Sequence, residues 1–325
     1  MHKHMCLVGA VVLGLAGLLQ AEPLQPKQIS AEAKWVVHFD VDAMRTTIFA
    51  LKAAEKVRQH FPDAEWHLDR VRAEWMFDPC TDIHGMTFYG DRLVPDTGVV
   101  LVHVNIDQKV LLEKAKQAPD YRVSKYGNYD LHTWTHAKGS KHQRDITGAF
   151  FGRDLIVFGG STAEVMAALD VLDGTKPNLT AKSSPLAAPV PPGATFVARV
   201  VGLADAKLPC KSPVVKQLDA VSLALGESQG ESFFAAEMRV KKAELAEQMR
   251  IAAEGLRAMA MIAAADDQQA QEMIKALKIS SSTDMVGAEW RFSAEELWNR
   301  MEKECERMKE KGWPHHKPFW FQPKR

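Results

Sequence analysis

A proline-rich segment near the middle of the chain limits the possible folds more than any other feature of the sequence. Between Lys176 and Gly193, proline occupies positions 177, 185, 189, 191 and 192, with mostly small residues between them. Proline fixes φ and has no backbone donor, so neither a helix nor a central strand can continue through this segment. The sequence therefore predicts a linker at 174–193 that separates a first unit, 34–173, from a second unit, 194–311.

The first unit alternates strand patterns with helix patterns. Runs of β-branched and aromatic residues predict strands, and apolar residues three and four positions apart predict helices. Strands are expected at 34–41, 82–89, 98–106 and 129–136, followed by a hairpin at 146–158. Helices are expected at 44–60, 65–76 and 108–117, and a further helix that ends at Leu172 begins with the capping box of Ser161 and Glu164.

The second unit repeats the order strand, helix, strand, strand, helix. Its strands are expected at 194–201, 218–226, 232–240 and 284–292, its long helix begins near Lys241, and its last helix runs from Ser293 to Lys311. A shared order favours a diverged internal duplication, although amphipathic elements can also resemble one another by chance. The expected fold class is α+β, with two related units, each an antiparallel sheet with helices packed on one face.

The N-terminus has the pattern of a secretory signal peptide. A short polar start is followed by an uncharged apolar run from Met5 to Leu19 and by Ala21, after which the chain turns polar. This order predicts a signal peptide at 1–21 and a mobile leader at 22–33. The apolar run is short for a membrane span, which needs about 20 residues, although an uncleaved anchor is the alternative. Cys6 lies at the wrong end of the segment for lipidation.

Charge and cysteine content limit the classes of partner. The full chain has a net charge of 0, and loss of residues 1–21, which contain Lys3 and no acid, changes it to −1. A near-neutral chain has no general field to attract nucleic acid. Cys80 and Cys210 each follow a proline, before the second strand of each unit. We expect these two cysteines to lie close together, as a structural disulfide or as inert thiols.

Histidines on predicted strands are the basis for the hypothesis of a metal site in the first unit. Imidazoles and a carboxylate could converge there if the strand faces coincide, because zinc takes three or four such ligands. Local ligand spacing such as HExxH is absent, so separate, half-exposed histidines are the simpler interpretation. The candidate ligands are His38, Asp40, His103, His132 and His136.

The C-terminal tail, 312–325, combines basic and aromatic residues and contains no acid. Prolines at 314, 318 and 323 prevent regular structure. Such a tail suits an anionic surface or a groove on a partner, whereas the simpler alternative is that its rings pack on the protein's own core. The candidate interaction residues are Trp313, Phe319, Trp320 and Phe321.

Two stretches resemble a group of exported bacterial proteins of unknown function. One is the opening Ala33–Ala43 behind a signal peptide, and the other runs from Leu277 through Val286–Leu297. The resemblance implies two tandem α+β units and an exported location, and it carries over no catalytic residue.

No sequence motif identifies a catalytic or cofactor-binding residue: the chain lacks a Gly-x-Ser-x-Gly elbow and a complete glycine fingerprint. We therefore expect a periplasmic or secreted, non-enzymatic binding or interaction protein of the cell envelope, without a cofactor and without a membrane span after signal cleavage. Its partner would be an envelope protein, a polymer or a small ligand. The alternatives are a metal-dependent hydrolase that uses the strand histidines and a purely structural envelope component.

Overall fold

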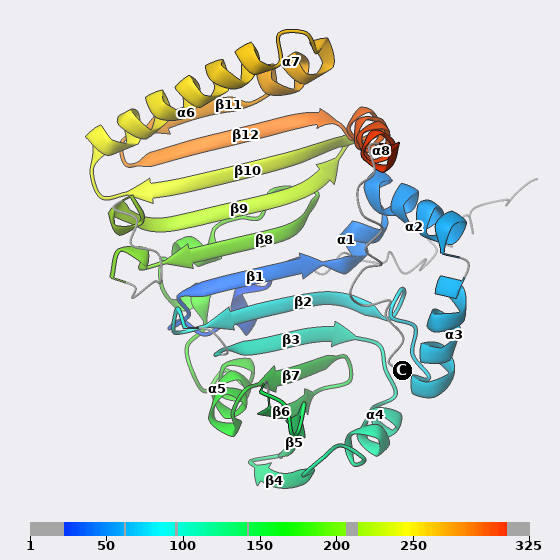
Figure 1. Ribbon diagram of the computed structural model, residues 1–325. Coiled ribbons are helices and arrows are strands. Elements are labelled where there is room, and N and C mark those ends of the chain that lie inside the picture. The colour runs from blue at the N-terminus through cyan, green and yellow to red at the C-terminus, as the bar shows by residue number, and fades with distance from the viewer. Residues whose placement is uncertain (1–22, 62, 95–96, 142, 206–213, 311–325) are drawn as a thin grey trace, which may run out of the picture.

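The computed structural model describes residues 23–61, 63–94, 97–141, 143–205 and 214–310. Within these ranges, twelve strands form one antiparallel sheet in the order β11-β12-β10-β9-β8-β1-β2-β3-β7-β6-β5-β4 (Figure 1). The strands are β1 (Trp35–Asp40), β2 (Ile83–Gly90), β3 (Val99–Val104), β4 (Arg122–Tyr126), β5 (Tyr129–His136), β6 (Arg144–Phe151), β7 (Leu155–Gly159), β8 (Ala194–Val201), β9 (Leu218–Ser228), β10 (Glu231–Val240), β11 (Lys278–Ser282) and β12 (Met285–Ser293).

Helices lie at the ends of the sheet and on both of its faces (Figure 1). They are α1 (Val41–Arg45), α2 (Ile48–His60), α3 (Asp63–Trp75), α4 (Gln108–Ala115), α5 (Thr162–Leu172), α6 (Ala243–Ala263), α7 (Gln268–Lys275) and α8 (Ala294–Glu310). Short 3-10 helices are η1 (Pro26–Gln28), η2 (Leu179–Ala181), η3 (Pro185–Ala187), η4 (Leu203–Asp205) and η5 (Val215–Gln217).

Pairing of β1 with β8 joins the two halves of the chain. Trp35 lies opposite Val200 and Phe39 lies opposite Phe196 in this antiparallel pair. Each half begins with one of these strands, and the pairing satisfies backbone groups that would otherwise form an open sheet edge. The sequence predicts an antiparallel sheet in each unit, and the structure shows that the strands of both units belong to one continuous sheet.

The strand order follows the same rule on each side of this central pair. Moving outward from the central pair, the second strand of each half lies beside the first, and the third lies beside the second. The last strand of that half in chain order then lies beside the third strand. In the first half β7 returns beside β3, and in the second half β12 returns beside β10. In both halves a helix, α4 or α6, leads the chain away from the third strand.

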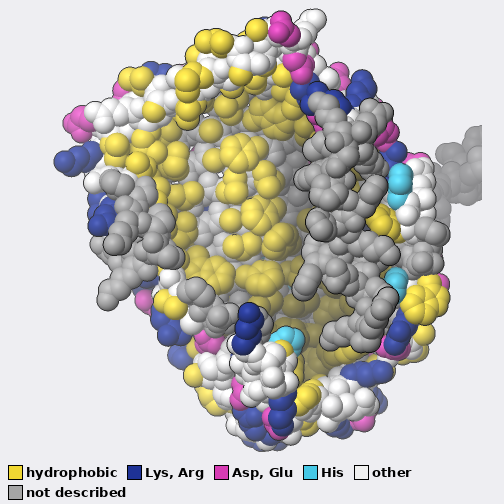
Figure 2. All heavy atoms as spheres, in the orientation of Figure 1, with side chains coloured by type: hydrophobic (Ala, Val, Ile, Leu, Met, Phe, Trp, Pro, Cys, Tyr) yellow, Lys and Arg dark blue, Asp and Glu magenta, His cyan; other side chains and the backbone are white. Residues whose placement is uncertain are grey.

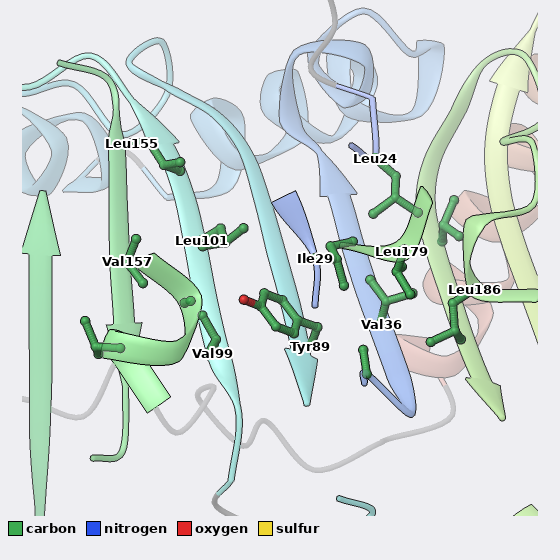
Figure 3. Close-up of a cluster of buried hydrophobic side chains, with 14 of the residues drawn as sticks. Leu24, Ile29, Val36, Tyr89, Val99, Leu101, Leu155, Val157, Leu179 and Leu186 are labelled. Carbon is green, nitrogen blue, oxygen red and sulfur yellow. The ribbon is translucent and has the colours of Figure 1, made fainter. Parts of the chain in front are cut away.

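One face of the sheet carries the main hydrophobic core, and we call it the closed face. Val36, Tyr89, Leu101 and Val157 lie on it, and α5 packs against its β6–β7 region (Figure 3). Leu169 of α5 is completely buried in this cluster. Burying a leucine or valine side chain contributes about 1.5–3 kcal/mol, so this cluster is the main apolar contribution to the stability of the first half.

The leader and the proline-rich linker complete this core. Ile29 and Leu186 are fully buried in it (Figure 3), and the amide of Leu179 donates to the carbonyl of Ile29 at 2.9 Å. The expectation of a mobile leader is therefore wrong for residues 23–33, because its apolar side chains fill the space over β1 and β8. Buried Arg199 of β8 fastens the linker by donating to three of its carbonyls, those of Leu186, Ala188 and Pro189, at 2.7–3.0 Å.

Several elements differ from expectation. The helix expected at 44–60 is broken between α1 and α2, where Thr47 caps α2 by accepting from the amide of Ala50 at 3.1 Å. The edge strands β4 and β11 were not expected, because their exposed, polar residues give no buried-strand pattern. Helices were expected on one face only, yet α5 lies on the closed face while α4 and α6 lie over the opposite face.

Candidate functional site: the open face of the sheet

The sheet face opposite the core is apolar from one end to the other, and we call it the open face. Successive side chains of a strand point to opposite faces of the sheet. Val36 and His38 are buried on the closed face, so Val37 between them lies on the open face, together with the residues that pair with it on neighbouring strands. Cross-strand pairing runs from Val37 through every strand of the sheet. This central row consists of Ile279, Ala288, Ala236, Leu223, Ala198, Val37, Phe88, Val100, Phe158, Gly148, His132 and Val123.

A second row runs parallel to the central row at a distance of two residues along the strands, and it is apolar across nine of them. Phe39 lies near its middle, with ring centroids 6.1 Å from Phe88 of the central row and 5.1 Å from Phe196. Its members are Trp290, Phe234, Leu225, Phe196, Phe39, Met86, Val102, Ile156 and Phe150.

These side chains are only partly covered by the described residues. Val37, Phe39, Phe88 and Phe196 are each half-buried, whereas their neighbours on the closed face are buried. Figure 2 shows the hydrophobic side chains gathered over the middle of this face, in a hollow between raised rims. Backbone N–H and C=O groups are used in the strand ladder, so the face offers a ligand apolar contacts and almost no hydrogen bonds.

A cleft of about 640 Å³ lies on the open face under α6 and α7. Its floor includes Phe234, Ala288 and Trp290 from the sheet, and Leu256 of α6 and Ile274 of α7 form part of its wall. The indole nitrogen of Trp290 donates to the carbonyl of Met273 at 2.8 Å, so the polar atom of this ring is already satisfied. What remains accessible in the cleft is almost entirely hydrocarbon.

A second cleft of about 480 Å³ lies over the centre of the sheet. Trp35, Phe88, Val100 and Phe158 line it, and the indole nitrogen of Trp35 donates to the carbonyl of Arg92 at 2.9 Å. Apart from Arg144 and Thr97 at its border, this cleft also has an apolar lining.

A smaller pocket of about 230 Å³ lies under α4, and we call it the α4 pocket. Leu111 and Leu112 of α4 form one wall, and the sheet supplies Trp134 and Phe158, which also line the central cleft. Gly148 forms part of the floor, where an added Cβ would lie 3.0 Å from the ring of Phe158. The central cleft and the α4 pocket are therefore neighbouring parts of one apolar surface.

Helices α2 and α8 pair beside one end of the strands (Figure 1). Phe49 of α2 meets Trp298 of α8 edge to face with ring centroids 5.1 Å apart. Lys56 pairs with Glu302, and this contact raises the pKa of Lys56 and lowers the pKa of Glu302. A helix from each half of the chain thus contributes to one rim of the molecule.

The five candidate metal ligands are divided between the two faces of the sheet. His38, Asp40 and His103 are buried on the closed face, whereas His132 and His136 alternate with buried residues of β5 and belong to the open face. His38 Nδ1 lies 2.9 Å from Thr87 Oγ1, and Asp40 caps α1 by accepting from the amide of Ala43 at 2.8 Å. The five residues therefore do not converge, and the part of the chain in view contains no metal-sized group of three such side chains.

A polar cluster next to the closed-face ligands was not anticipated. Buried Asp42 accepts from Arg45 and lies 2.9 Å from His84 Nδ1, while Arg45 also donates to the carbonyl of Ile83. These contacts tie α1 to the start of β2. The cluster therefore has a clear role in holding the chain where it leaves β1.

Other predicted features fall partly or wholly outside the described residues. Cys80 is exposed, and its predicted disulfide partner Cys210 lies outside those residues, so the pairing stays a prediction. The signal peptide, 1–21, and the tail residues Trp313, Phe319, Trp320 and Phe321 also lie outside them. Within the ranges that the structure describes, no helix is long and apolar enough to cross a membrane.

Sequence patterns alone did not reveal the open face. The strands β3 and β7 are apolar at most positions on both sides, which is typical of strands buried on both faces. The missing alternation of hydrophobic and polar residues was the sequence signal that could have indicated a second apolar face. Only the tertiary structure shows that the described residues leave one of the two faces partly uncovered.

Comparison with known proteins finds a weak similarity of shape. No family model matches the sequence, and no curated protein matches it. Three crystal forms of TP0453, a Treponema pallidum protein, align over 85%, 84% and 88% of this chain and 96%, 96% and 99% of theirs. Their sequence identities are 10%, 9% and 8%, and their TM-scores are 0.42, 0.45 and 0.42. The chain is thus similar to TP0453 in its general course, and values of this size say nothing about function.

Proposed function

We propose that this protein is an exported, non-enzymatic binding protein of the bacterial cell envelope that holds the hydrocarbon chain of a lipid on its open face. The observation that carries the proposal is the central row, which crosses all twelve strands with His132 as its one polar side chain. Export is supported by the signal-peptide pattern of residues 1–21.

Exposed apolar area of this extent favours an apolar ligand. Patches larger than a few hundred Å² are uncommon on soluble monomers and mark binding sites. Each CH₂ group removed from water contributes about 0.8 kcal/mol, so a long alkyl chain gains affinity from length alone. The clefts under α6 and over the sheet centre, about 640 and 480 Å³, are of the size of small-molecule sites.

The lack of hydrogen-bonding groups on the face distinguishes a lipid from an extended peptide. A bound peptide strand needs partners for its own N–H and C=O groups, and it finds them at a sheet edge. The open face instead presents side chains such as Phe39, Phe88 and Phe196, far from the two edge strands. A hydrocarbon chain needs no such partners and can lie across these rings without leaving a polar group unsatisfied.

A pair of valine substitutions in the central row tests the proposal. Val100 lines the central cleft, whereas Val123 is 49% exposed on the edge strand β4 and is not among the cleft-lining residues. In Val100→Gln an amide enters the apolar cleft, and because burying an unpaired amide costs about 1–3 kcal/mol, affinity should fall about tenfold or more. The measurement is titration with the fluorescent apolar probe N-phenyl-1-naphthylamine, after circular dichroism has shown that both variants are folded.

Val123→Gln is the matched control and should bind the probe as the wild type does. Equal affinities for all three proteins, or no probe binding by the wild type, would overturn the proposal. The proposal would also be contradicted if the protein bound an apolar peptide but neither the probe nor chains derived from phospholipids.

A further inference from the structure

The α4 pocket differs from the other two clefts on the open face because two of its lining side chains, an ammonium group and an imidazole, can donate hydrogen bonds to a negatively charged group. Lys114 of α4 and His132 of β5 both line it, among side chains that are otherwise apolar, such as Leu111, Phe150 and Ile156. We propose that this pocket holds the carboxylate end of a single-chain fatty acid, whose hydrocarbon chain continues over Trp134 and Phe158 into the central cleft. The inference rests on the proposed function and adds the chemical class of the ligand.

Lys114 has no carboxylate of its own within the described residues. Its ammonium group lies over the ring of Trp75, 5.8 Å from the ring centroid. The carboxylate of Glu74, which interacts electrostatically with the charge of Lys114, is already paired with Arg70 at 2.9 Å. Lys114 is a half-buried residue. An anion that enters the pocket would stabilise its ammonium group, because charge-assisted hydrogen bonds gain strength where water is excluded.

His132 is oriented by a neighbour that leaves one ring nitrogen available. Its Nδ1 lies 2.7 Å from the hydroxyl of Tyr121, and the two rings stack with centroids 6.0 Å apart. Within the described residues, Nε2 has no hydrogen-bond partner. Asp130, the acid that acts on this imidazole, is paired with Lys125 at 2.7 Å. The imidazole therefore offers the ligand a polar atom of fixed position in the same pocket that Lys114 lines.

Pocket size selects a single chain with a compact head group. About 230 Å³ is enough for a carboxylate and the first methylene groups, and it is small compared with the 300–1,000 Å³ of typical ligand sites. A two-chain lipid with a large head group would need more room. The shared lining residues Trp134 and Phe158 give the chain a continuous apolar path out of the pocket.

The experiment compares cis-parinaric acid with its methyl ester, which has the same fluorescent chain and no charge. The wild-type protein should bind the acid about tenfold more tightly than the ester, as expected for one charge-assisted contact. Lys114→Met should abolish this preference while retaining binding of the ester. Lys114→Arg, which keeps the charge, should restore the preference.

Lys109→Met is the control, because Lys109 is an exposed lysine of the same helix that does not line the pocket. It should retain the preference for the acid. Equal binding of acid and ester by the wild type would overturn the head-group inference and leave the proposed lipid binding intact. Failure to bind either probe would overturn both. A preference for the acid that survives Lys114→Met in the folded protein would show that the head group lies elsewhere.

Discussion

At the scale of single residues, His132 is the polar exception in an apolar row, and its surroundings predict a pH effect. Burial lowers the pKa of His132 below its ordinary value of 6.5. As the pH falls through that value, the unfolded chain takes up a proton at this position before the folded protein does, so acid lowers the free energy of unfolding. His132→Gln should therefore lose less stability than the wild type between about pH 7.5 and about pH 5, as measured by urea unfolding. His136→Gln, at an exposed position of the same strand, is the control. Identical losses in wild type and His132→Gln would contradict the argument.

At the scale of elements, α5 shows how a local signal in the sequence positions a core helix. Ser161 Oγ accepts from the amide of Glu164 at 3.3 Å, and Glu164 also accepts from the amide of Gly98 at 3.1 Å, which fixes the helix start against β3. Ser161→Ala removes this cap and should lower the free energy of unfolding by about 1 kcal/mol, within the usual 0.5–2 kcal/mol. Chemical denaturation measures the change. Ser282→Ala, at an exposed position of edge strand β11, should have little effect, and an equal effect of the two substitutions would show that the cap is not what matters.

At the scale of the whole molecule, the β1–β8 pair makes the two halves depend on each other. Val197 of β8 and the linker residues Leu179 and Leu186 belong to the same buried cluster as Val36 of β1. A chain of residues 23–193 lacks β8, so β1 becomes an open edge and part of the cluster is lost. This fragment should fail to show cooperative thermal unfolding by circular dichroism, whereas residues 23–310 should melt in a single transition. Cooperative melting of the short fragment at the temperature of the longer chain would show that the halves are independent.

Local patterns predicted much of the fold because they report on short-range energetics. The capping box at Ser161, the strand at 194–201 and the turn between β6 and β7 all depend on residues within a few positions of one another. Asp267, which caps α7 by accepting from the amide of Ala270 at 2.8 Å, also acts on residues close to it in the sequence. The order of strands in the two halves agrees with an internal duplication, which stays a prediction.

The sequence by itself determined the α+β class, most of the helices and strands, and their order in each half. It could do so because helix and strand periodicity, and the effect of proline on the backbone, depend only on residues close together in the chain. Tertiary structure alone decided that β1 pairs with β8, since strand pairing across some 160 residues leaves no local pattern. The tertiary structure also decided on which face of the sheet each histidine lies: His38 of β1 is buried in the core, and His132 of β5 lies on the opposite face. The open face depends on the same tertiary arrangement. Strands that are apolar on both sides do not specify which side is covered, and here α5, the leader and the linker cover one side, whereas the described residues cover the other side only in part.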